Sequence, residues 1–413
     1  MKKIYVKLIA LLFISITFFW SCQPEGKTKI MFIGVDGLDW ELLDKLIAER
    51  SVPSFMKLTE NGASAKVNTN DKGGSAVYWT TIATGQLSSK HGIKNFITVD
   101  PTTKKRVPVT SNTRKSKAFW NILSEHNISV GVVGWYVTWP AEKVNGFMVS
   151  SYFGIKDVEQ PTWKGTIYAN TPHMVFPSEL QEEVDGYIQK AEQRYLQNLQ
   201  KIIKPSALKK NYGVIKQIKW VFLTDEIFHE AGLNLYRQRK PRVFAVYFEG
   251  VDAVGHRFTF TKSVRQKQAN RRFGNVQKKY YLYTDKLVEQ YLKAADKNTV
   301  IIIASDHGLM RGHHTNNGVF IISGPGIKKN FRCLKPINLT DMLPTMLYIL
   351  GLPIAKDMDG QPFLDAFEED YLAQKKVQYI RTYGKQKKIS NFPTPSELDE
   401  KILERLKSLG YIK

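Results

Sequence analysis

The sequence predicts an α/β fold built around a mainly parallel sheet. Five short runs are nearly continuous in apolar, β-branched or aromatic residues, and each ends in or just before Asp, Gly or Ser. These runs are Lys29–Val35, Ser129–Val133, Val243–Glu249, Thr299–Ser305 and Val319–Ser323. Such runs are typical of strands that are buried on both faces. Helix-like stretches alternate with them, and this alternation favours a parallel sheet covered by helices.

The predicted helices of the main domain are spaced between these strands. They are Trp40–Glu49, Ser116–Glu125, Lys279–Ala295 and Leu339–Leu350. We expect the main domain to comprise residues 28–155 and 241–367.

The residues between these two parts read differently. Residues 156–240 suggest helices with irregular joins, Pro177–Leu199 and then Val214–Arg239, and we interpret them as a helical cap inserted into the main domain. Residues 368–413 form a charged, helix-prone tail, whose last predicted helix is Glu397–Leu409.

The composition excludes several classes of protein. The 413 residues are 43% hydrophobic and 24% charged, which is ordinary for a folded chain and excludes a disordered or collagen-like one. Two cysteines exclude a disulfide framework and a zinc finger built from cysteines. A single long apolar run, at the N-terminus, excludes a polytopic membrane protein.

That N-terminal run predicts export. Lysines precede the apolar stretch Leu8–Trp20, which is shorter than the roughly 20 residues of a membrane span. Ser21-Cys22 closes it, and the layout resembles a bacterial lipoprotein signal over residues 1–22, with Cys22 lipidated. The alternative is an uncleaved anchor that starts near Ile4. Both interpretations place the chain outside the cytoplasm, tethered to the cell envelope as a periplasmic or cell-surface protein, and leave Cys333 as a buried apolar residue.

The net charge of +22 leaves two interpretations open. It indicates either a solvated basic surface beside an anionic membrane or attraction of anionic substrates. No recognisable nucleic-acid module is present, so we expect no specific nucleic-acid binding.

Acidic and histidine residues follow the predicted strands. They are Asp36 after the first run, Asp252 with His256 four residues later, Asp306 with His307, and then His313 and His314. Ligand sites in open parallel sheets lie beyond the carboxyl ends of the strands. Carboxylate oxygens and imidazole nitrogens are common zinc ligands, and this set is large enough for two divalent ions.

Each element alone has a simpler explanation. Asp36 could cap a helix, Asp252 and His256 could be a surface pair, and Asp306-His307 could form a turn. Their combination favours a metal site, because four of the eight histidines fall in two short segments, each beside an Asp at a strand end.

Ser75 is the candidate nucleophile. Gly73 and Gly74 precede it, and the segment that follows reads as the start of a helix. A hydroxyl there lies near exposed N–H groups and the positive end of the helix dipole, and a metal ion can lower its pKa directly. The alternative is that Ser75 only caps the helix.

Together these residues resemble the alkaline phosphatase superfamily, and most closely its type I phosphodiesterase/nucleotide pyrophosphatase family. The resemblance covers Lys29–Ile155 and Arg242–Phe363. Its motifs, in chain order, are GVDG, SAVYWTTIATG with KHGI, EGVDAVGH, ASDHG, HTNNGVFIISGPGI, DMLPTMLYILGLP and DMDGQPF. The resemblance implies an α/β/α sandwich.

The resemblance also implies roles for the matching residues. Asp36, Ser75, Asp306 and His307 would surround one ion, and Asp252, His256 and His314 would hold the other. His314 is preferred to His313 because the last ligand of the family precedes an x-x-x-Gly. Asn95 lies near the position of an Asn that contacts phosphoryl oxygens. Zinc is the first choice for both ions, and manganese is the alternative.

The implied activity is hydrolysis of a phosphodiester or nucleotide pyrophosphate through a phosphoseryl intermediate. Two alternatives stay open: a phosphomonoesterase on the same site, and a tethered, non-catalytic protein that binds an anionic ligand. Some monoesterase relatives carry a Lys-x-Arg pair, which is not apparent near Gly134–Pro140, and this favours diesters.

Two departures from related patterns bear on the activity. The pyrophosphatases usually have Thr-Phe-Pro where this chain has Ser75-Ala76-Val77. Sulfatases need a Cys or Ser followed by x-Pro-x-Arg, and Val77 and Trp79 stand at those positions, which argues against a sulfatase.

Overall fold

A computed structural model describes residues 27–153, 172–210, 213–386, 393–396, 399–409 and 412. Within these ranges a ten-stranded sheet crosses the molecule in the order β13-β2-β12-β9-β1-β8-β5-β6-β7, with β14 beside β2. The predicted export segment and Cys22 lie outside the described residues.

The strands of this sheet are short and buried. They are β1 (Lys29–Val35), β2 (Gly62–Asn68), β5 (Val130–Val133), β6 (Gly146–Val149), β7 (Val175–Phe176), β8 (Val243–Phe248), β9 (Thr299–Ala304), β12 (Gly318–Ser323), β13 (Phe331–Arg332) and β14 (Ile337–Asn338). Smaller pairs join β3 (Ile97–Val99) to β4 (Arg106–Pro108), β10 (Gly308–Met310) to β11 (His313–Thr315), and β15 (Ile354–Ala355) to β16 (Tyr379–Ile380).

Strand direction confirms the predicted fold class. β1 lies at the centre and pairs in parallel with both β8 and β9, and β5 and β6 continue the parallel part. β12 and β7 run antiparallel to their neighbours. Because the carboxyl ends of β1, β8 and β9 point the same way, the residues that follow them meet at one edge of the sheet.

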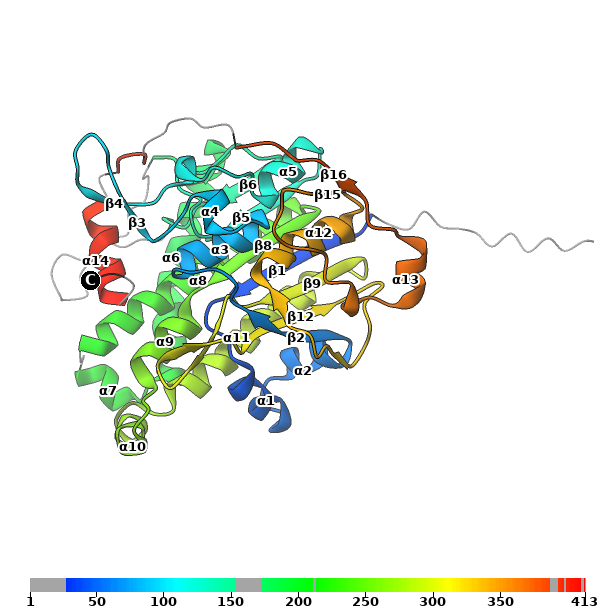
Figure 1. The fold of residues 1–413 in the computed structure, drawn as a ribbon. Coiled ribbons are helices and arrows are strands. Elements are labelled where there is room, and N and C mark those ends of the chain that lie inside the picture. The colour runs from blue at the N-terminus through cyan, green and yellow to red at the C-terminus, as the bar shows by residue number, and fades with distance from the viewer. Residues whose placement is uncertain are drawn as a thin grey trace, which may run out of the picture.

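Helices cover both faces of the sheet and make three layers (Figure 1). One layer contains α3 (Ser75–Thr84), α5 (Phe119–Glu125) and α12 (Met342–Leu350). The other contains α1 (Trp40–Ala48), α2 (Pro53–Glu60), α6 (Gln181–Ile202), α8 (Gly213–Arg239), α9 (Gly250–Phe258) and α11 (Val276–Ala294). The remaining helices are α4 (Ser88–His91), α7 (Pro205–Lys210), α10 (Ser263–Phe273), α13 (Glu369–Gln374) and α14 (Asp399–Leu409).

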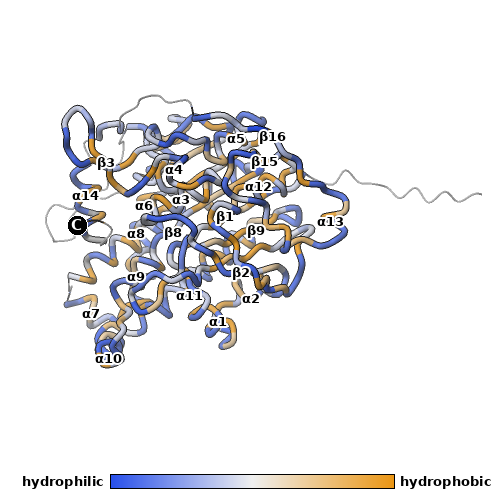
Figure 2. Tube along the Cα trace, viewed as in Figure 1, coloured by the Kyte–Doolittle hydropathy of each residue, from blue (hydrophilic) through white to orange (hydrophobic). Residues whose placement is uncertain are grey.

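The side chains of β1 show why its sequence is apolar throughout. Met31, Ile33 and Val35 belong to one hydrophobic core, and Ile30 and Phe32 belong to the core on the opposite face. The tube coloured by hydropathy shows the same arrangement, with hydrophobic segments in the sheet and a largely hydrophilic α10 at the periphery (Figure 2).

The predicted strands are all present, with ends that shift by at most one residue. β2 was not predicted, because its sequence, GASAKVN, consists of small and polar residues. Gly62 in this strand would place a Cβ 2.2 Å from the carbonyl oxygen of Ile322, so close pairing with β12 requires glycine there. The predicted helix Ser116–Glu125 begins only at Phe119.

The segment predicted as a cap contains two long helices, α6 and α8. They pack on each other, and α8 also contacts β5, β8 and α9, so both helices share one core with the sheet. The division into domains stays a prediction. Cys333 is buried with a free thiol, as expected. No helix in the described ranges is both long enough and apolar enough to cross a membrane.

Candidate active site

Three strand ends and one hairpin bring the predicted ligands together. Asp36 follows β1, and Asp306 and His307 follow β9. Asp252 and His256 lie one turn apart on α9, which begins directly after β8. His314 lies in β11, where it pairs with Leu309 of β10.

The first group surrounds the Nε2 atom of His307. This atom lies 3.4 Å from Asp36 Oδ1 and 3.5 Å from Asp306 Oδ2. The Nδ1 atom of the same ring lies 3.2 Å from the carbonyl oxygen of Gly308. That contact fixes the proton on Nδ1 and leaves Nε2 as an acceptor that can bind a metal ion.

The second group surrounds Oδ1 of Asp252. His256 Nε2 lies 3.3 Å from this oxygen and His314 Nε2 lies 3.6 Å from it. The two Nε2 atoms are 2.9 Å apart. The ring of His314 also stacks on that of His307, with 3.7 Å between the ring centroids, so the two groups adjoin each other.

Ser75 is the first residue of α3, as predicted, and only 1% of it is exposed. Its Oγ is buried and makes no hydrogen bond of standard geometry within the described residues. The two glycines before it are sterically required. Gly73 has a φ of +149° and would place a Cβ 2.5 Å from Val77, and Gly74 would place one 2.5 Å from the ring of Phe96.

The carboxylates form a strongly interacting cluster. Burial and the charge of Asp252 raise the pKa of Asp36 to about 6. Burial and the charges of Asp36 and Asp252 raise the pKa of Asp306 well above its usual value. Burial also opposes ionisation of Asp252, but the hydrogen bond from His256 and the charge of His307 lower its pKa to about 2. Each of these carboxyls is a site where a bound cation would relieve the cost of burying negative charge.

The donor atoms fit two divalent ions. Asp36, Asp306 and His307 offer atoms that all lie within 4.8 Å of one another, and so do Asp252, His307 and His314. Asp36 Oδ1, Asp306 Oδ2 and His307 Nε2 are buried and make no hydrogen bond of standard geometry to any residue that the structure describes. Buried polar atoms usually have partners, so unpaired oxygen and nitrogen atoms that converge on one point indicate metal ligands.

Comparison with known families identifies the relationship. Residues 30–345 match the model of the type I phosphodiesterase / nucleotide pyrophosphatase family. The chain belongs to this family. The family predicted from the sequence is thereby confirmed.

The sequence identity between this family member and its individual relatives is low. Arylsulfatase K of Bos taurus is 25% identical over 141 residues, 30% of this chain and 26% of that one. A 2,3-bisphosphoglycerate-independent phosphoglycerate mutase of Gracilaria tenuistipitata var. liui is 23% identical over 69% of this chain and 53% of its own length. The chain spans about a quarter of the length of the arylsulfatase K sequences that it matches.

Among solved structures, a mutant of alkaline phosphatase PafA superposes with a TM-score of 0.53. It is 12% identical and covers 83% of this chain and 100% of its own. This likeness confirms the alkaline phosphatase-like fold.

In this member of the phosphodiesterase family, neighbouring side chains hydrogen-bond to the candidate metal ligands. Tyr247 OH and Trp79 Nε1 donate to Asp36 Oδ2, at 2.6 Å and 3.2 Å, which leaves Oδ1 to face the site. Thr69 Oγ1 donates to the carbonyl oxygen of Asp306, and the Ser305 hydroxyl donates to that of His307. Such partners orient the ligands and their loss usually weakens metal binding.

Sequence reasoning missed Asp39, which holds the hairpin that carries His314. Asp39 Oδ2 accepts a hydrogen bond from Thr315 Oγ1 at 2.6 Å, and its Oδ1 accepts one from Asn317 Nδ2 at 2.9 Å. The same carboxylate caps α1 by accepting from the N–H of Glu41. An Asp directly before the predicted helix at Trp40 signalled the cap, but nothing local indicated the contacts 276 residues away.

Asp225 was missed as well. It lies on α8, and its carboxylate accepts from the backbone N–H groups of Glu249 and Gly250, at 3.0 Å and 3.1 Å. Tyr280 OH donates to it at 2.8 Å. Asp225 thus caps the start of α9, the helix that carries Asp252 and His256.

Asp71 holds the loop that precedes Ser75. Its carboxylate accepts hydrogen bonds from the hydroxyls of Thr81 and Ser88 and from the N–H of Ser88, each at 2.7 Å. His91 Nε2 lies 3.1 Å from Thr81 Oγ1 and completes the network. These contacts tie the residues before Ser75 to α3 and α4.

Asn95 is the predicted residue with the weakest structural connection. It is exposed, and its Oδ1 accepts a hydrogen bond from the N–H of Phe96 at 2.8 Å. Its neighbour Phe96 packs against Gly74, so Asn95 lies in the loop beside Ser75. Its role in binding phosphoryl oxygens stays a prediction.

Proposed function

We propose that this chain is a metal-dependent phosphodiesterase that acts through Ser75. The observation that carries the proposal is the buried Ser75 hydroxyl at the start of α3, beside a cluster of three fully buried carboxyl side chains and the histidines that face them. The family match supports the choice of phosphate esters.

Each of the two groups of side chains would hold one metal ion. Asp36, Asp306 and His307, with the Ser75 oxygen, would hold one ion, and Asp252, His256 and His314 the other. Zinc suits this set of oxygen and nitrogen donors, with manganese as the alternative. When bound, two such ions would lower the pKa of the Ser75 hydroxyl and neutralise the charge that develops on the phosphoryl oxygens.

The residues of the chain then perform two displacements at phosphorus. Ser75 Oγ gives its proton to solvent and attacks phosphorus, the bond to the leaving alkoxide breaks and the alkoxide takes up a proton from solvent, and the remaining phosphoryl group stays on Ser75 as a phosphoseryl ester. Water attacks next, the bond to Ser75 Oγ breaks, and the serine is restored. The start of α3 favours negative charge at this position, because the positive end of the helix dipole lies there.

Diesters are the favoured substrates. A monoester carries a second negative charge near the reaction centre, for which basic side chains would be expected. The fourteen residues that line the cavity beside Ser75 include no Lys or Arg. The export and the lipid tether at Cys22 are part of the proposal and place the substrate at the cell envelope.

A sulfatase is the second candidate, because the curated relatives include arylsulfatase K. The positions after Ser75 speak against it. Val77 and Trp79 are fully buried parts of the hydrophobic cores, where a sulfatase would carry Pro and Arg.

The experiment compares nitrophenyl phosphodiester, phosphomonoester and sulfate ester as substrates of the zinc- or manganese-loaded protein. Wild type is assayed with Ser75→Ala and, as a control, Ser51→Ala, whose hydroxyl contacts only Glu49 at the surface among the described residues. We expect diester turnover that chelation and Ser75→Ala abolish and Ser51→Ala leaves intact.

Other outcomes would change the assignment. Preference for the monoester or the sulfate would keep the site and change the substrate. Absence of turnover with two bound ions would favour the non-catalytic binding protein, and absence of bound metal would contradict the proposal as a whole.

A further inference from the structure

Two segments of the chain carry much of its positive charge. Residues 193–224 contain seven Lys and Arg, residues 253–284 contain eight, and neither segment contains Asp or Glu. The net charge of the whole chain is +22, so the excess is concentrated in these two segments. Arg194 and Lys278 form ion pairs with Glu residues outside the segments.

The fold brings the two segments together. Lys204, directly before α7, donates its backbone N–H to the carbonyl oxygen of Phe273 at 3.0 Å, and its Nζ donates to that of Arg271 at 3.0 Å. Arg257 Nε donates to Gln217 Oε1 of α8 at 3.0 Å. The end of α6, α7 and α10 therefore form one surface, which we call the basic lobe. Its exposed cations are Lys201, Lys204, Lys209, Lys210, Lys262, Arg265, Lys267, Arg271 and Arg272.

Packing does not explain the sequence of α10. Ala269 is the one buried residue of the eleven in this helix, all of which the structure describes. Lys262 stands at its N-cap, where the helix dipole opposes positive charge. Lys267 and Arg271 place like charges one turn apart, which also destabilises a helix. These costs indicate that the cations have a function other than stabilising the fold.

α10 is fixed to α9, the helix that carries two candidate ligands. Gln266 Oε1 accepts from the N–H of Phe260 at 2.8 Å, and Gln266 Nε2 donates to the carbonyl oxygen of Phe258, the last residue of α9, at 3.0 Å. The ring of Phe273 packs edge to face on that of Phe258, with 5.4 Å between the centroids. The cations of α10 therefore keep a fixed position relative to His256.

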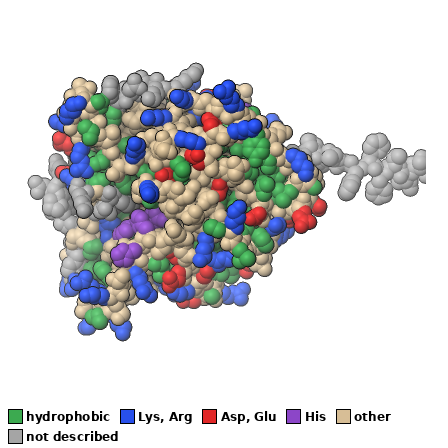
Figure 3. Space-filling model, viewed as in Figure 1, with side chains coloured by type: hydrophobic (Ala, Val, Ile, Leu, Met, Phe, Trp, Pro, Cys, Tyr) green, Lys and Arg blue, Asp and Glu red, His purple; other side chains and the backbone are tan. Residues whose placement is uncertain are grey.

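The basic lobe adjoins the second group of candidate ligands. Arg257 follows His256 directly in α9. The hairpin that carries His314 lies against the end of the same helix, because a Cβ on Gly312 would lie 3.3 Å from the carbonyl oxygen of Thr259. Figure 3 shows a group of histidines on this face, with Lys and Arg side chains gathered below it over α7 and α10.

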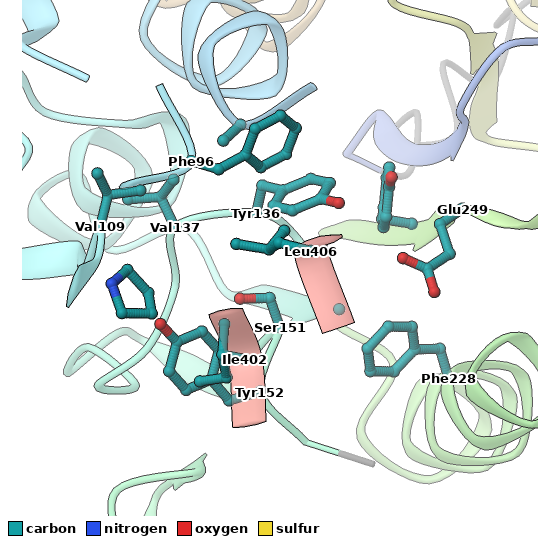
Figure 4. Close-up of a pocket in the computed structure, with 14 residues that line it drawn as sticks. Phe96, Val109, Tyr136, Val137, Ser151, Tyr152, Phe228, Glu249, Ile402 and Leu406 are labelled. Atoms are coloured by element: carbon teal, nitrogen blue, oxygen red, sulfur yellow. The ribbon is translucent and has the colours of Figure 1, made fainter. Parts of the chain in front are cut away.

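The cavity beside Ser75 has a different lining. Rings and apolar side chains surround it, among them Phe96, Tyr136 and Phe228 (Figure 4). The fourteen residues of this lining include no Lys or Arg. The positive charge of the basic lobe is therefore placed to contact neighbours of the scissile group rather than the group itself.

We propose that the basic lobe binds an anionic polysaccharide and that the scissile phosphodiester is carried on this polymer. The inference rests on the proposed phosphodiesterase function and names its substrate class. Lys and Arg side chains bind successive anionic groups of a linear polymer, and charge of one sign beside a site raises the local concentration of such a substrate. With one phosphodiester at Ser75, the polymer would pass His256 and continue over α10, an eleven-residue helix roughly 16 Å long.

The uncharged side chains of the basic lobe favour a polysaccharide over two other polyanions. Thr261, Ser263, Gln268 and Asn275 are exposed and offer hydrogen bonds to hydroxyl groups. Single-stranded nucleic acids stack their bases on aromatic rings, and no ring is exposed in residues 201–210 or 257–279, which the structure describes throughout. Membrane surfaces are bound by large apolar side chains beside cations, and in the same two ranges only Val264 is such a side chain that is exposed.

The first test measures binding without turnover. Fluorescein-labelled heparin, a polyanionic polysaccharide, is titrated into metal-loaded Ser75→Ala protein at low salt, and its fluorescence anisotropy is followed. We expect saturable binding that the added triple change Arg265→Gln/Lys267→Gln/Arg271→Gln weakens by about tenfold, because three exposed charge contacts are lost.

A matched triple variant controls for the loss of net charge. Lys329→Gln/Lys335→Gln/Lys376→Gln removes three exposed cations away from the lobe and should bind heparin within about twofold of its parent. Equal weakening by both triple variants, or by neither, would overturn the inference.

Competition identifies the class of polyanion. Dextran sulfate should displace the labelled heparin, and neutral dextran should not. A thymidine oligonucleotide that binds more tightly than heparin would overturn the assignment in favour of a nucleic acid. Tighter binding to phosphatidylglycerol vesicles would overturn it in favour of a membrane surface.

Inhibition tests whether the polymer reaches the site. Heparin should inhibit hydrolysis of a nitrophenyl phosphodiester by the protein with Ser75 intact, because a polymer on the lobe would cover the second group of ligands. The inhibition constant, measured against the uninhibited rate of each protein, should rise about tenfold in the α10 triple variant. Removal of metal by heparin would inhibit both proteins equally and would count against the inference.

These outcomes separate the inference from the proposed function. Heparin binding that the α10 triple variant loses would support the polysaccharide site even if no nitrophenyl diester were hydrolysed. Hydrolysis of nitrophenyl diesters by a protein that does not bind heparin would overturn the polysaccharide site alone.

Discussion

At the residue scale, the site concentrates negative charge that the fold itself does not neutralise. Asp36, Asp252 and Asp306 are each fully buried and lie around two groups of histidines. Burial of these carboxylates lowers the stability of the metal-free protein. The same cluster favours cation binding, because the candidate ligands are already oriented and partly desolvated.

The raised pKa of Asp36 predicts a pH-dependent stability of the metal-free protein. Its pKa is about 6 in the folded chain against 3.8 as the ordinary value. The folded state holds this proton more tightly, so stability falls as the pH rises from about 4 to about 6. Asp36→Asn, which can still accept from Tyr247 and Trp79, should therefore stabilise the metal-free protein at pH 8 by on the order of 2–3 kcal/mol.

Urea unfolding in the presence of a chelator measures this effect at pH 8 and below pH 4. The stabilisation should vanish at the lower pH, where Asp36 is protonated in both states. A stabilisation that is the same at both pH values would show that charge is not its cause.

Asp39 predicts an effect on metal binding without contact to the metal. Asp39→Ala removes the acceptor of Thr315 and Asn317 and so loosens the hairpin that carries His314. We expect metal affinity to fall by roughly 10–100-fold, as for other residues that orient ligands. Competition with a chromophoric chelator measures it, and Asn61→Ala, whose side chain bonds within α2 at the surface, serves as the control. Unchanged affinity would refute the positioning role.

At the scale of elements, helix α8 supports the candidate metal site. α8 contributes Asp225 to the start of α9 and Phe228 to the wall of the cavity. Gly134 leaves room for the Phe228 ring at the cavity wall. It has a φ of +73°, and a Cβ there would lie 2.6 Å from the Phe228 ring.

The capping role of Asp225 predicts a linked loss of stability and metal affinity. Asp225→Ala leaves two backbone N–H groups and the Tyr280 hydroxyl without their acceptor, which should cost on the order of 3 kcal/mol. It should also weaken metal binding, because α9 carries two ligands.

The chain offers a matched control for this prediction. Asp285 caps α2 in the same way, accepting from the N–H groups of Ser54 and Phe55 at 2.9 Å each. Asp285→Ala should lower stability in urea unfolding without changing metal affinity. Equal metal affinity in both variants would contradict a specific role for Asp225.

At the scale of the whole molecule, metal binding should be linked to folding. The ligands come from the ends of β1 and β9, from α9 and from β11, and these segments meet only in the assembled sheet. Metal at about 1,000 times its Kd should therefore stabilise the chain by about 4 kcal/mol, a rise in Tm of several degrees. Calorimetry with and without zinc measures the shift.

Adjacent histidines provide the control for this experiment. His314→Ala should remove most of the zinc-induced rise in Tm, and His313→Ala, its exposed neighbour in β11, should retain it. The reverse result would exchange the roles predicted for the two residues.

The class of fold, the core strands and the acidic and histidine residues at the strand ends could all be predicted from the order of the amino acids. Strands such as β1 and β9 were predictable because burial on both faces leaves a continuous apolar run. Asp36, Asp306 and Asp252 were recognisable because each follows such a run.

The residues that support these candidate ligands could be identified only in the folded chain. The antiparallel direction of β12, the small-residue strand β2, and the contacts of Asp39 and Asp225 depend on partners far away in the chain. The cavity beside Ser75 likewise combines side chains from α8, β8 and α14. The local pattern of apolar residues shows which face of a helix or strand is buried, but not which residues pack against that face. The contacts around the site could therefore not be predicted from the sequence.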